Sequence, residues 1–168
     1  MVAHIDSDDE SKILALYNEI LKQWNRRSAA GMANLFEDNG DLIGFDGSRF
    51  NGKGEIEKHL SYIFANHQTP KYVGKMRSIR FLNSEVAVLV AVGGLVEPDR
   101  NDIHKELNAV QTLVALKQGK EEWKIAIYQN TPAAYHGRPD LGEQLTEELR
   151  LASATWTCKL RDNIDVAI

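Results

Sequence analysis

Two glutamines, Gln111 and Gln129, interrupt rows of residues that otherwise suit a buried strand face. The rows are Leu107, Ala109, Gln111, Leu113 and Ala115 in one segment, and Trp123, Ile125, Ile127, Gln129 and Thr131 in the next. Because side chains of a β-strand alternate between faces, each glutamine is expected to share a face with core residues. A buried amide without a partner costs about 1–3 kcal/mol. We therefore expect each glutamine to be hydrogen-bonded by another side chain, by water or by a ligand.

A histidine, His59, is the first candidate for acid–base chemistry. It lies beside Ile56, Leu60 and Ile63 at helical spacing and could therefore point inward. Histidine changes its charge near neutral pH, which suits a general acid or base. The alternative is a partly buried histidine that is hydrogen-bonded to the backbone.

The sequence lacks the common local patterns of metal and phosphate sites. His59 and His67 are eight positions apart, unlike the four of a zinc-binding His-Glu-x-x-His motif. The glycines of Gly52-Lys53-Gly54 are not followed by the Lys-Ser/Thr ending of a phosphate loop, so this segment is interpreted as a turn and helix start. No Gly-x-Ser-x-Gly elbow is present. We expect no metal and no cofactor.

The composition is that of an ordinary globular protein. The 168 residues predict one domain, and the net charge of −4, with dispersed Lys and Arg, does not favour a nucleic-acid partner. The acidic segment 4–10 has the wrong charge for a targeting peptide, and no run of about 18 apolar residues indicates a membrane span. The single cysteine, Cys158, excludes an internal disulfide. These features predict a cytoplasmic protein.

The periodicity predicts elements that could position these side chains. A helical stripe runs from Ile13 to Trp24, and Ser28 can cap a short second helix that carries Met32, Leu35 and Phe36. A hairpin around Asp46-Gly47 and a third helix, 52–67, follow. The remaining elements are four long strands (71–82, 85–97, 105–118 and 122–131) and a helix from Pro139 that carries Leu141, Leu145, Leu149 and Ala152.

Segregated helices and strands predict an α+β fold, a curved and mainly antiparallel sheet with helices on its concave side. We expect one domain over residues 1–168, with a common core of about 7–135 and a C-terminal extension, 136–168. The segment 85–97 is apolar on both of its faces, so a second subunit or the C-terminal helix must cover the outside of the sheet.

Three motifs in this order resemble the nuclear-transport-factor-2-like superfamily, also called SnoaL-like or ketosteroid-isomerase-like. They are Leu35-Phe36-Glu37-Asp38, Gly52-Lys53-Gly54-Glu55-Ile56, and Trp123-Lys124-Ile125-Ala126 leading into Gln129-Asn130-Thr131. The last motif is similar to that of the SgcJ/EcaC subgroup, which carries an oxidoreductase label for which the sequence shows no cofactor signature. The resemblance implies a cone-shaped α+β barrel and a homodimer that forms through the outer face of the sheet.

The resemblance also implies a ligand pocket inside the cone. The expected ligand-contacting residues are Trp24, Phe45, Phe50, His59, Gln111 and Gln129. Steroid isomerases place a catalytic aspartate in the first hairpin, and the corresponding count from Leu35 reaches Gly44, which cannot take a proton. Their oxyanion-binding tyrosine on the first helix could correspond to Tyr17, which fits the core stripe equally well.

Three functions remain open from the sequence. The protein could bind a mainly apolar small molecule without a defined reaction. It could be an isomerase, cyclase or dehydratase in which His59 acts as the base and Tyr17 or Gln129 stabilises an oxyanion. It could also be a non-catalytic dimerisation or assembly module whose interior is only a core.

Overall fold

The computed structural model describes the backbone of residues 7–162 and the side chains of residues 8–155. The helices are α1 (Ser7–Asn25), α2 (Ala29–Ala33), α3 (Lys53–Asn66) and α4 (Pro139–Asp162), with a short 3₁₀ helix, η1 (Lys105–Leu107). The strands are β1 (Phe36–Ile43), β2 (Arg49–Asn51), β3 (Lys71–Asn83), β4 (Val86–Val96), β5 (Ala109–Gln118) and β6 (Glu122–Pro132).

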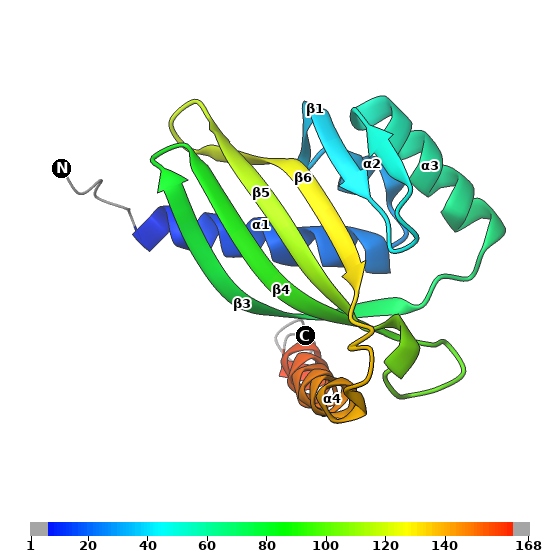
Figure 1. Ribbon diagram of the computed structural model, residues 1–168. Coiled ribbons are helices and arrows are strands. Elements are labelled where there is room, and N and C mark those ends of the chain that lie inside the picture. The colour runs from blue at the N-terminus through cyan, green and yellow to red at the C-terminus, as the bar shows by residue number, and fades with distance from the viewer. Residues whose placement is uncertain (1–6, 163–168) are drawn as a thin grey trace.

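The six strands form one curved sheet in the order β2-β1-β6-β5-β4-β3 (Figure 1). All neighbours are antiparallel except β1 and β6, which run parallel. The predicted α+β class and long antiparallel strands are confirmed. The predicted strand 105–118 begins later than expected: residues 105–107 form η1, and β5 begins only at Ala109.

The inner face of the sheet is covered by α1, which lies behind the strands in Figure 1. The predicted stripe of α1 is confirmed: Ile13, Tyr17 and Ile20 are at most 1% exposed. They belong to one core with Leu89 of β4 and Leu113 of β5. This packing makes the helix and these two strands a rigid support for any polar group between them.

The second helix is shorter than its sequence predicts. Ser28 caps it as expected, since its side-chain oxygen accepts a hydrogen bond from the Gly31 amide at 3.1 Å. The helix ends at Ala33, however, and Phe36 begins β1. Phe36 pairs with Ile125 of β6, whose amide donates to the Leu35 carbonyl at 2.9 Å. Pairing with β6 therefore overrides the helical pattern.

The C-terminal helix α4 packs on the outer face of the sheet. Leu145 and Leu149 are buried against Val73, Val92 and Ile103 in a core cluster of their own. Ala152 packs against the same cluster, as the predicted helical stripe requires. The sheet admits the helix closely at Gly94, where a Cβ atom would lie 2.9 Å from Cδ1 of Leu149.

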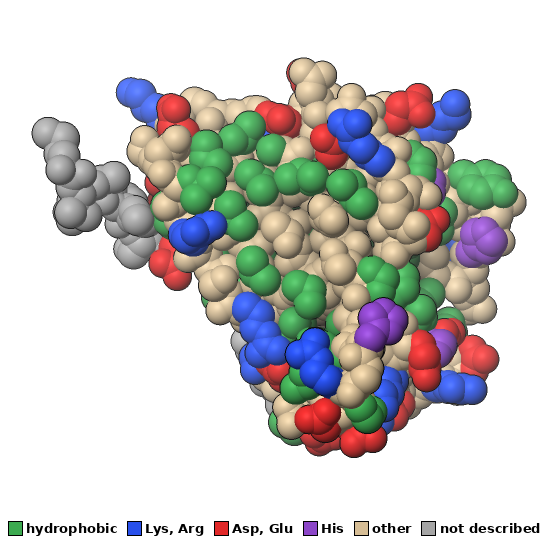
Figure 2. Space-filling model, in the orientation of Figure 1, with side chains coloured by type: hydrophobic (Ala, Val, Ile, Leu, Met, Phe, Trp, Pro, Cys, Tyr) green, Lys and Arg blue, Asp and Glu red, His purple; other side chains and the backbone are tan. Residues whose placement is uncertain are grey.

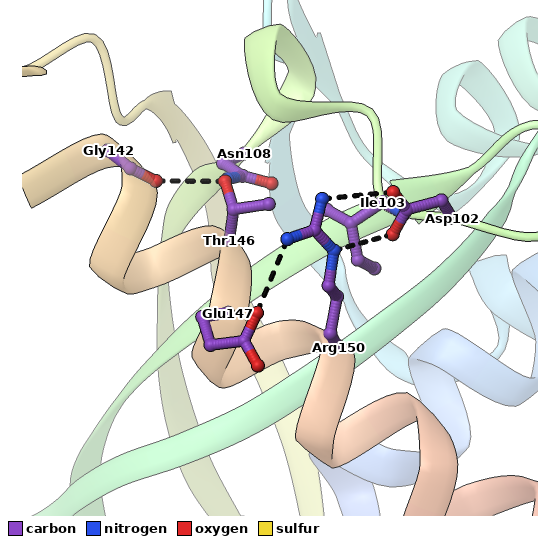
Figure 3. Close-up of polar contacts among 7 residues, drawn as sticks. All are labelled: Asp102, Ile103, Asn108, Gly142, Thr146, Glu147 and Arg150. Atoms are coloured by element: carbon purple, nitrogen blue, oxygen red, sulfur yellow. Dashed lines mark hydrogen bonds and ion pairs between the residues drawn. The ribbon is translucent and has the colours of Figure 1, made fainter.

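Polar contacts fix α4 against the connection between β4 and β5 (Figure 3). The Arg150 guanidinium donates to both carboxylate oxygens of Asp102, at 2.7 and 2.9 Å. Closer to the start of the helix, Asn108 donates to the Thr146 hydroxyl at 2.9 Å, and that hydroxyl donates to the Gly142 carbonyl at 2.8 Å. The extension is thus held by both apolar and polar contacts.

The first turn of α1 is tied to β5 and β6 by the buried carboxylate of Asp9. One carboxylate oxygen pairs with the Lys117 ammonium at 2.9 Å, and the other accepts a hydrogen bond from the Trp123 indole at 2.9 Å. These two bonds lower the pKa of Asp9 below its usual value. None of the described helices is long and apolar enough to cross a membrane.

Candidate functional site

A chain of buried polar side chains crosses the interior between α1 and the sheet. The Tyr17 hydroxyl donates to Oε1 of Gln111 at 2.6 Å. Nε2 of Gln111 donates to Oδ1 of Asn130 at 2.9 Å. Gln111 is 0% exposed and Asn130 is 8% exposed. The buried glutamine that the sequence indicated is therefore satisfied by two other side chains, one from α1 and one from β6.

Two glycines give this chain its space. Gly74 of β3 and Gly93 of β4 lie opposite one another in the sheet. A Cβ atom at Gly93 would lie 2.7 Å from Nε2 of Gln111, and one at Gly74 would collide with the Tyr17 hydroxyl. Glycine is needed at both positions because the polar chain approaches the backbone.

A second buried tyrosine, Tyr128, lies beside this chain with its hydroxyl unsatisfied. Tyr128 is 2% exposed, and its hydroxyl oxygen has no hydrogen-bond partner among the described residues. Burial raises the pKa of Tyr128 well above its usual value, and the nearby Tyr17 and Tyr72 raise it further. The Asn130 side chain, which lies near the hydroxyl but outside hydrogen-bond geometry, opposes the rise. Burial also raises the pKa of Tyr17, and it raises the pKa of Tyr72 to about 12. The hydroxyls of these three residues, which we call the tyrosine cluster, are therefore protonated at neutral pH, and that of Tyr17 already donates to Gln111.

Gln129 does not join this cluster, so the prediction that it faces the interior is wrong. Val114 of β5 pairs with Ile127, whereas the next residue, Ala115, pairs with Ile125. Ala126 is thus an extra residue, a bulge that reverses the alternation along β6. Beyond it, Gln129 lies on the outer face opposite Thr112, and Asn130 takes the inward position opposite Gln111.

Other residues predicted for the pocket lie at the β2 edge of the sheet. The His59 ring of α3 stacks on the Phe50 ring of β2, with centroids 3.6 Å apart. Burial lowers the pKa of His59, and the nearby Asp46 carboxylate opposes that shift. Phe45 is half-buried in the turn between β1 and β2. Since β1 and β6 separate β2 from β5, this group does not meet Gln111 across the sheet.

A cavity of about 690 Å³ opens where α1 and α3 end, and Trp24 forms part of its wall. The Trp24 indole donates to the Pro70 carbonyl at 2.9 Å. Its ring meets Phe64 and Tyr72 edge-on, with centroids 5.3 and 5.2 Å apart. Trp24 therefore stands between this cavity and Tyr72, the outermost of the three tyrosines.

Neither Tyr128 nor Asn130 could be assigned to the site from the sequence. Both occupy positions that the simple alternation of β6 assigns to the outer face, and only the bulge turns them inward. Among the side chains that the structure describes, no three His, Cys, Asp or Glu groups converge as metal ligands would.

Comparison with known proteins places this geometry in a family. The family model described as a SnoaL-like domain matches residues 13–135, which is more than half of the chain. The chain belongs to the SnoaL-like family. The matched region contains α1 from Ile13 onward, the whole sheet and every member of the tyrosine cluster, and it ends before α4. The finer assignment to the SgcJ/EcaC subgroup stays a prediction. No protein with a curated description matches the chain.

Solved structures of several other proteins share the fold. A domain of unknown function with a cystatin-like fold from Nostoc punctiforme is 25% identical, with a TM-score of 0.73 over 94% of this chain and 99% of that one. A ketosteroid isomerase-like protein from Erwinia carotovora atroseptica is 15% identical, with a TM-score of 0.61 over 77% and 99% of the two chains. An NTF-2 like protein of unknown function from Shewanella oneidensis is 18% identical, with a TM-score of 0.61 over 73% and 98%. The Nostoc match alone of these three spans nearly all of this chain.

Proposed function

We propose that this SnoaL-like protein binds a mainly apolar small molecule in the cone, with an oxygen atom of the ligand accepting a hydrogen bond from Tyr128. The observation that carries the proposal is the fully buried Tyr128 hydroxyl, which has no protein partner among the described residues. Leaving such a group unsatisfied costs about 1–3 kcal/mol, and a ligand oxygen would recover this cost. A pocket with an apolar lining and a few polar groups is typical of small-molecule sites.

The neighbouring residues would have distinct roles in this binding. Gln111 orients the Tyr17 hydroxyl, because it accepts that proton while its own amide is held by Asn130. Trp24 lines the cavity at the open end and contacts Tyr72, so a ligand would reach the tyrosines past its ring. Phe50 and His59 would line only the β2 side of the cone.

The tyrosine hydroxyl donors, taken alone, would also suit an isomerase, cyclase or dehydratase, since protonated tyrosines stabilise a developing oxyanion. Such a reaction needs a base near the ligand as well. The candidate base, His59, is stacked on Phe50 at the β2 edge rather than beside the tyrosines. The geometry therefore favours binding over this chemistry.

Replacing Tyr128 with Phe separates the ligand contact from the fold. We expect Tyr128→Phe to leave the free energy of unfolding unchanged or to raise it by about 1 kcal/mol, because the unsatisfied hydroxyl is removed. Wild-type protein should bind 1-tetralone more tightly than tetralin, the matched hydrocarbon without the oxygen, by about tenfold in isothermal titration. The Tyr128→Phe variant should lose this preference. Equal affinity of the wild type for both compounds, or a preference that survives the substitution, would contradict the proposal.

We further propose that two copies associate through the outer face of the sheet. Half-buried apolar side chains cover this face on β4, β5 and β6: Val86, Val88, Val90, Val114, Leu116 and Ile127. Figure 2 shows hydrophobic side chains gathered over the strands above α4. The helix itself covers only the part around Val73 and Val92. A second copy would bury the remainder, as apolar patches of this kind often do at interfaces.

Sedimentation equilibrium at micromolar concentration tests the association. We expect a mass of about twice the 18.9 kDa of the chain. Val114→Lys should shift the protein to monomers, because it places a charge at the centre of the apolar face. Leu151→Lys is the matched control, since Leu151 lies on the exposed side of α4 with 64% of its surface accessible. A wild-type monomer, or a dimer that tolerates Val114→Lys, would reject this interface.

A further inference from the structure

The cavity beside Trp24, where α1 and α3 end, differs in its polar and charged groups from the interior of the cone. Its wall combines the Trp24 ring with many polar side chains, among them Asn66, Gln68, Asn101 and Lys71. A volume of about 690 Å³ is ample for a small ligand. The tyrosine cluster, by contrast, presents only a few hydroxyl donors among apolar residues.

The strongest charges of this cavity are already engaged by the protein. The Arg27 guanidinium donates to the carbonyl oxygens of Phe64 and His67 at the end of α3, and to the Thr69 hydroxyl. This contact offsets the negative end of the helix dipole. The Glu97 carboxylate pairs with the His104 ring at 2.9 Å. A ligand that binds the Arg27 guanidinium or the Glu97 carboxylate would therefore have to compete with these contacts.

The groups that remain are mostly neutral. Within the part of the chain that the structure describes, the Gln68 and Asn101 side chains make no hydrogen bond, and Asn66 uses only its amide nitrogen, toward the Tyr62 carbonyl. A side-chain amide offers both donors and an acceptor. Lys71 adds an ammonium donor that has no ion-pair partner among the described residues. A ligand that carries several hydroxyl groups, each a donor and an acceptor, matches this set best.

The aromatic wall points to the same class of ligand. Trp24 is half-buried, and its ring is held in place by the hydrogen bond to the Pro70 carbonyl and by T-shaped contacts with Phe64 and Tyr72. A large aromatic ring of this kind offers an apolar surface to the C–H face of a sugar ring. The amides then lie where they could bind the hydroxyl groups at the rim of that ring.

We propose that this cavity is a second binding site, which takes a neutral mono- or disaccharide against Trp24 with Gln68 and Asn101 as hydrogen-bonding partners. The inference does not rest on the ligand proposed for the tyrosine cluster. A sugar at this position would occupy the open end of the cone without entering it.

Nuclear magnetic resonance of the full chain tests this site. The indole N–H resonance of Trp24, assigned through Trp24→Phe, is followed while glucose, galactose, mannose, maltose, cellobiose and lactose are added in turn. We expect at least one of these sugars to shift the resonance saturably in the millimolar range. The double variant Gln68→Ala/Asn101→Ala should weaken binding at least tenfold. Both residues are exposed, so the fold should persist.

The control is Gln118→Ala/Gln144→Ala, which removes two exposed amides outside this cavity and should leave the affinity unchanged. The proposal is overturned if no sugar of this panel shifts the resonance at tens of millimolar. It is also overturned if the Gln68→Ala/Asn101→Ala variant binds like the wild type, or if glucuronate shifts the resonance and glucose does not. None of these outcomes bears on the 1-tetralone titration, which reports on Tyr128.

Discussion

Substituting Gln111 with Leu is expected to lower the free energy of unfolding by about 2–4 kcal/mol. The leucine removes the acceptor of the Tyr17 hydroxyl and the donor to Asn130 in one step. Both partners are then buried without a hydrogen bond, and each unsatisfied group costs about 1–3 kcal/mol. The loss of stability should arise mainly from these two unsatisfied groups, because a leucine side chain suits this apolar row.

Urea unfolding followed by circular dichroism measures this loss, and two further variants identify its cause. Replacing all three partners (Tyr17→Phe, Gln111→Leu, Asn130→Leu) should restore much of the stability, since no orphaned group remains. Gln129→Leu makes the same chemical change on the outer face and should stay within about 0.5 kcal/mol of the wild type. A Gln111→Leu variant as stable as the wild type would show that these three hydrogen-bonded side chains are not a coupled unit. A triple variant that loses as much stability as the three single variants together would show the same.

The same control illustrates what the sequence can and cannot predict. The alternation of apolar residues correctly indicated that Gln111 is buried, because β5 has no irregularity around it. The identical argument failed for Gln129, since the bulge at Ala126 shifts the following residues by one position. A bulge depends on how β6 pairs with β5, and a single strand carries no clear sign of it. The sequence therefore located half of the pair and missed Asn130.

The long elements were predictable for a related reason. The periods of α1 and of β3 to β6 extend over many residues, so one irregular position does not obscure them. The boundary at Phe36 was not predictable, because a helical pattern continued locally while pairing with Ile125 favoured a strand. The unsatisfied Tyr128 hydroxyl is harder still to predict from the sequence. It depends on where α1, β3 and β6 leave their polar atoms relative to one another.

Substituting Asp9 with Ala is expected to cost about 2–3 kcal/mol at pH 7, because it removes two hydrogen bonds to a carboxylate. The Lys117 ammonium and the Trp123 indole would both lose their acceptor. The side chains of Asp9 and Lys117 are only 13% and 20% exposed, so water replaces these bonds incompletely. Asp9→Asn should cost less, because the amide oxygen can still accept from Trp123 while the ion pair is lost.

The effect of Asp9 should depend on pH with a definite sign. Its pKa is lowered in the folded protein, mainly by the hydrogen bond with Lys117 and next by the one with Trp123. The unfolded chain therefore takes up the proton first as the pH falls, near the reference value of about 3.9. The stability that this carboxylate contributes is complete above that value and is lost as the pH falls through the lower pKa of the folded state.

Urea titrations of wild-type and Asp9→Ala protein between pH 3 and pH 8 measure this dependence. The difference in unfolding free energy should be constant from about pH 5 upward and should shrink below about pH 4. Asp8→Asn is the matched control: Asp8 pairs with Lys12 on the surface, where its side chain is 61% exposed, and should contribute less than about 1 kcal/mol. A difference that stays constant down to pH 3 would mean that the charge of Asp9 does not hold α1 to the sheet, and that its packing alone does so.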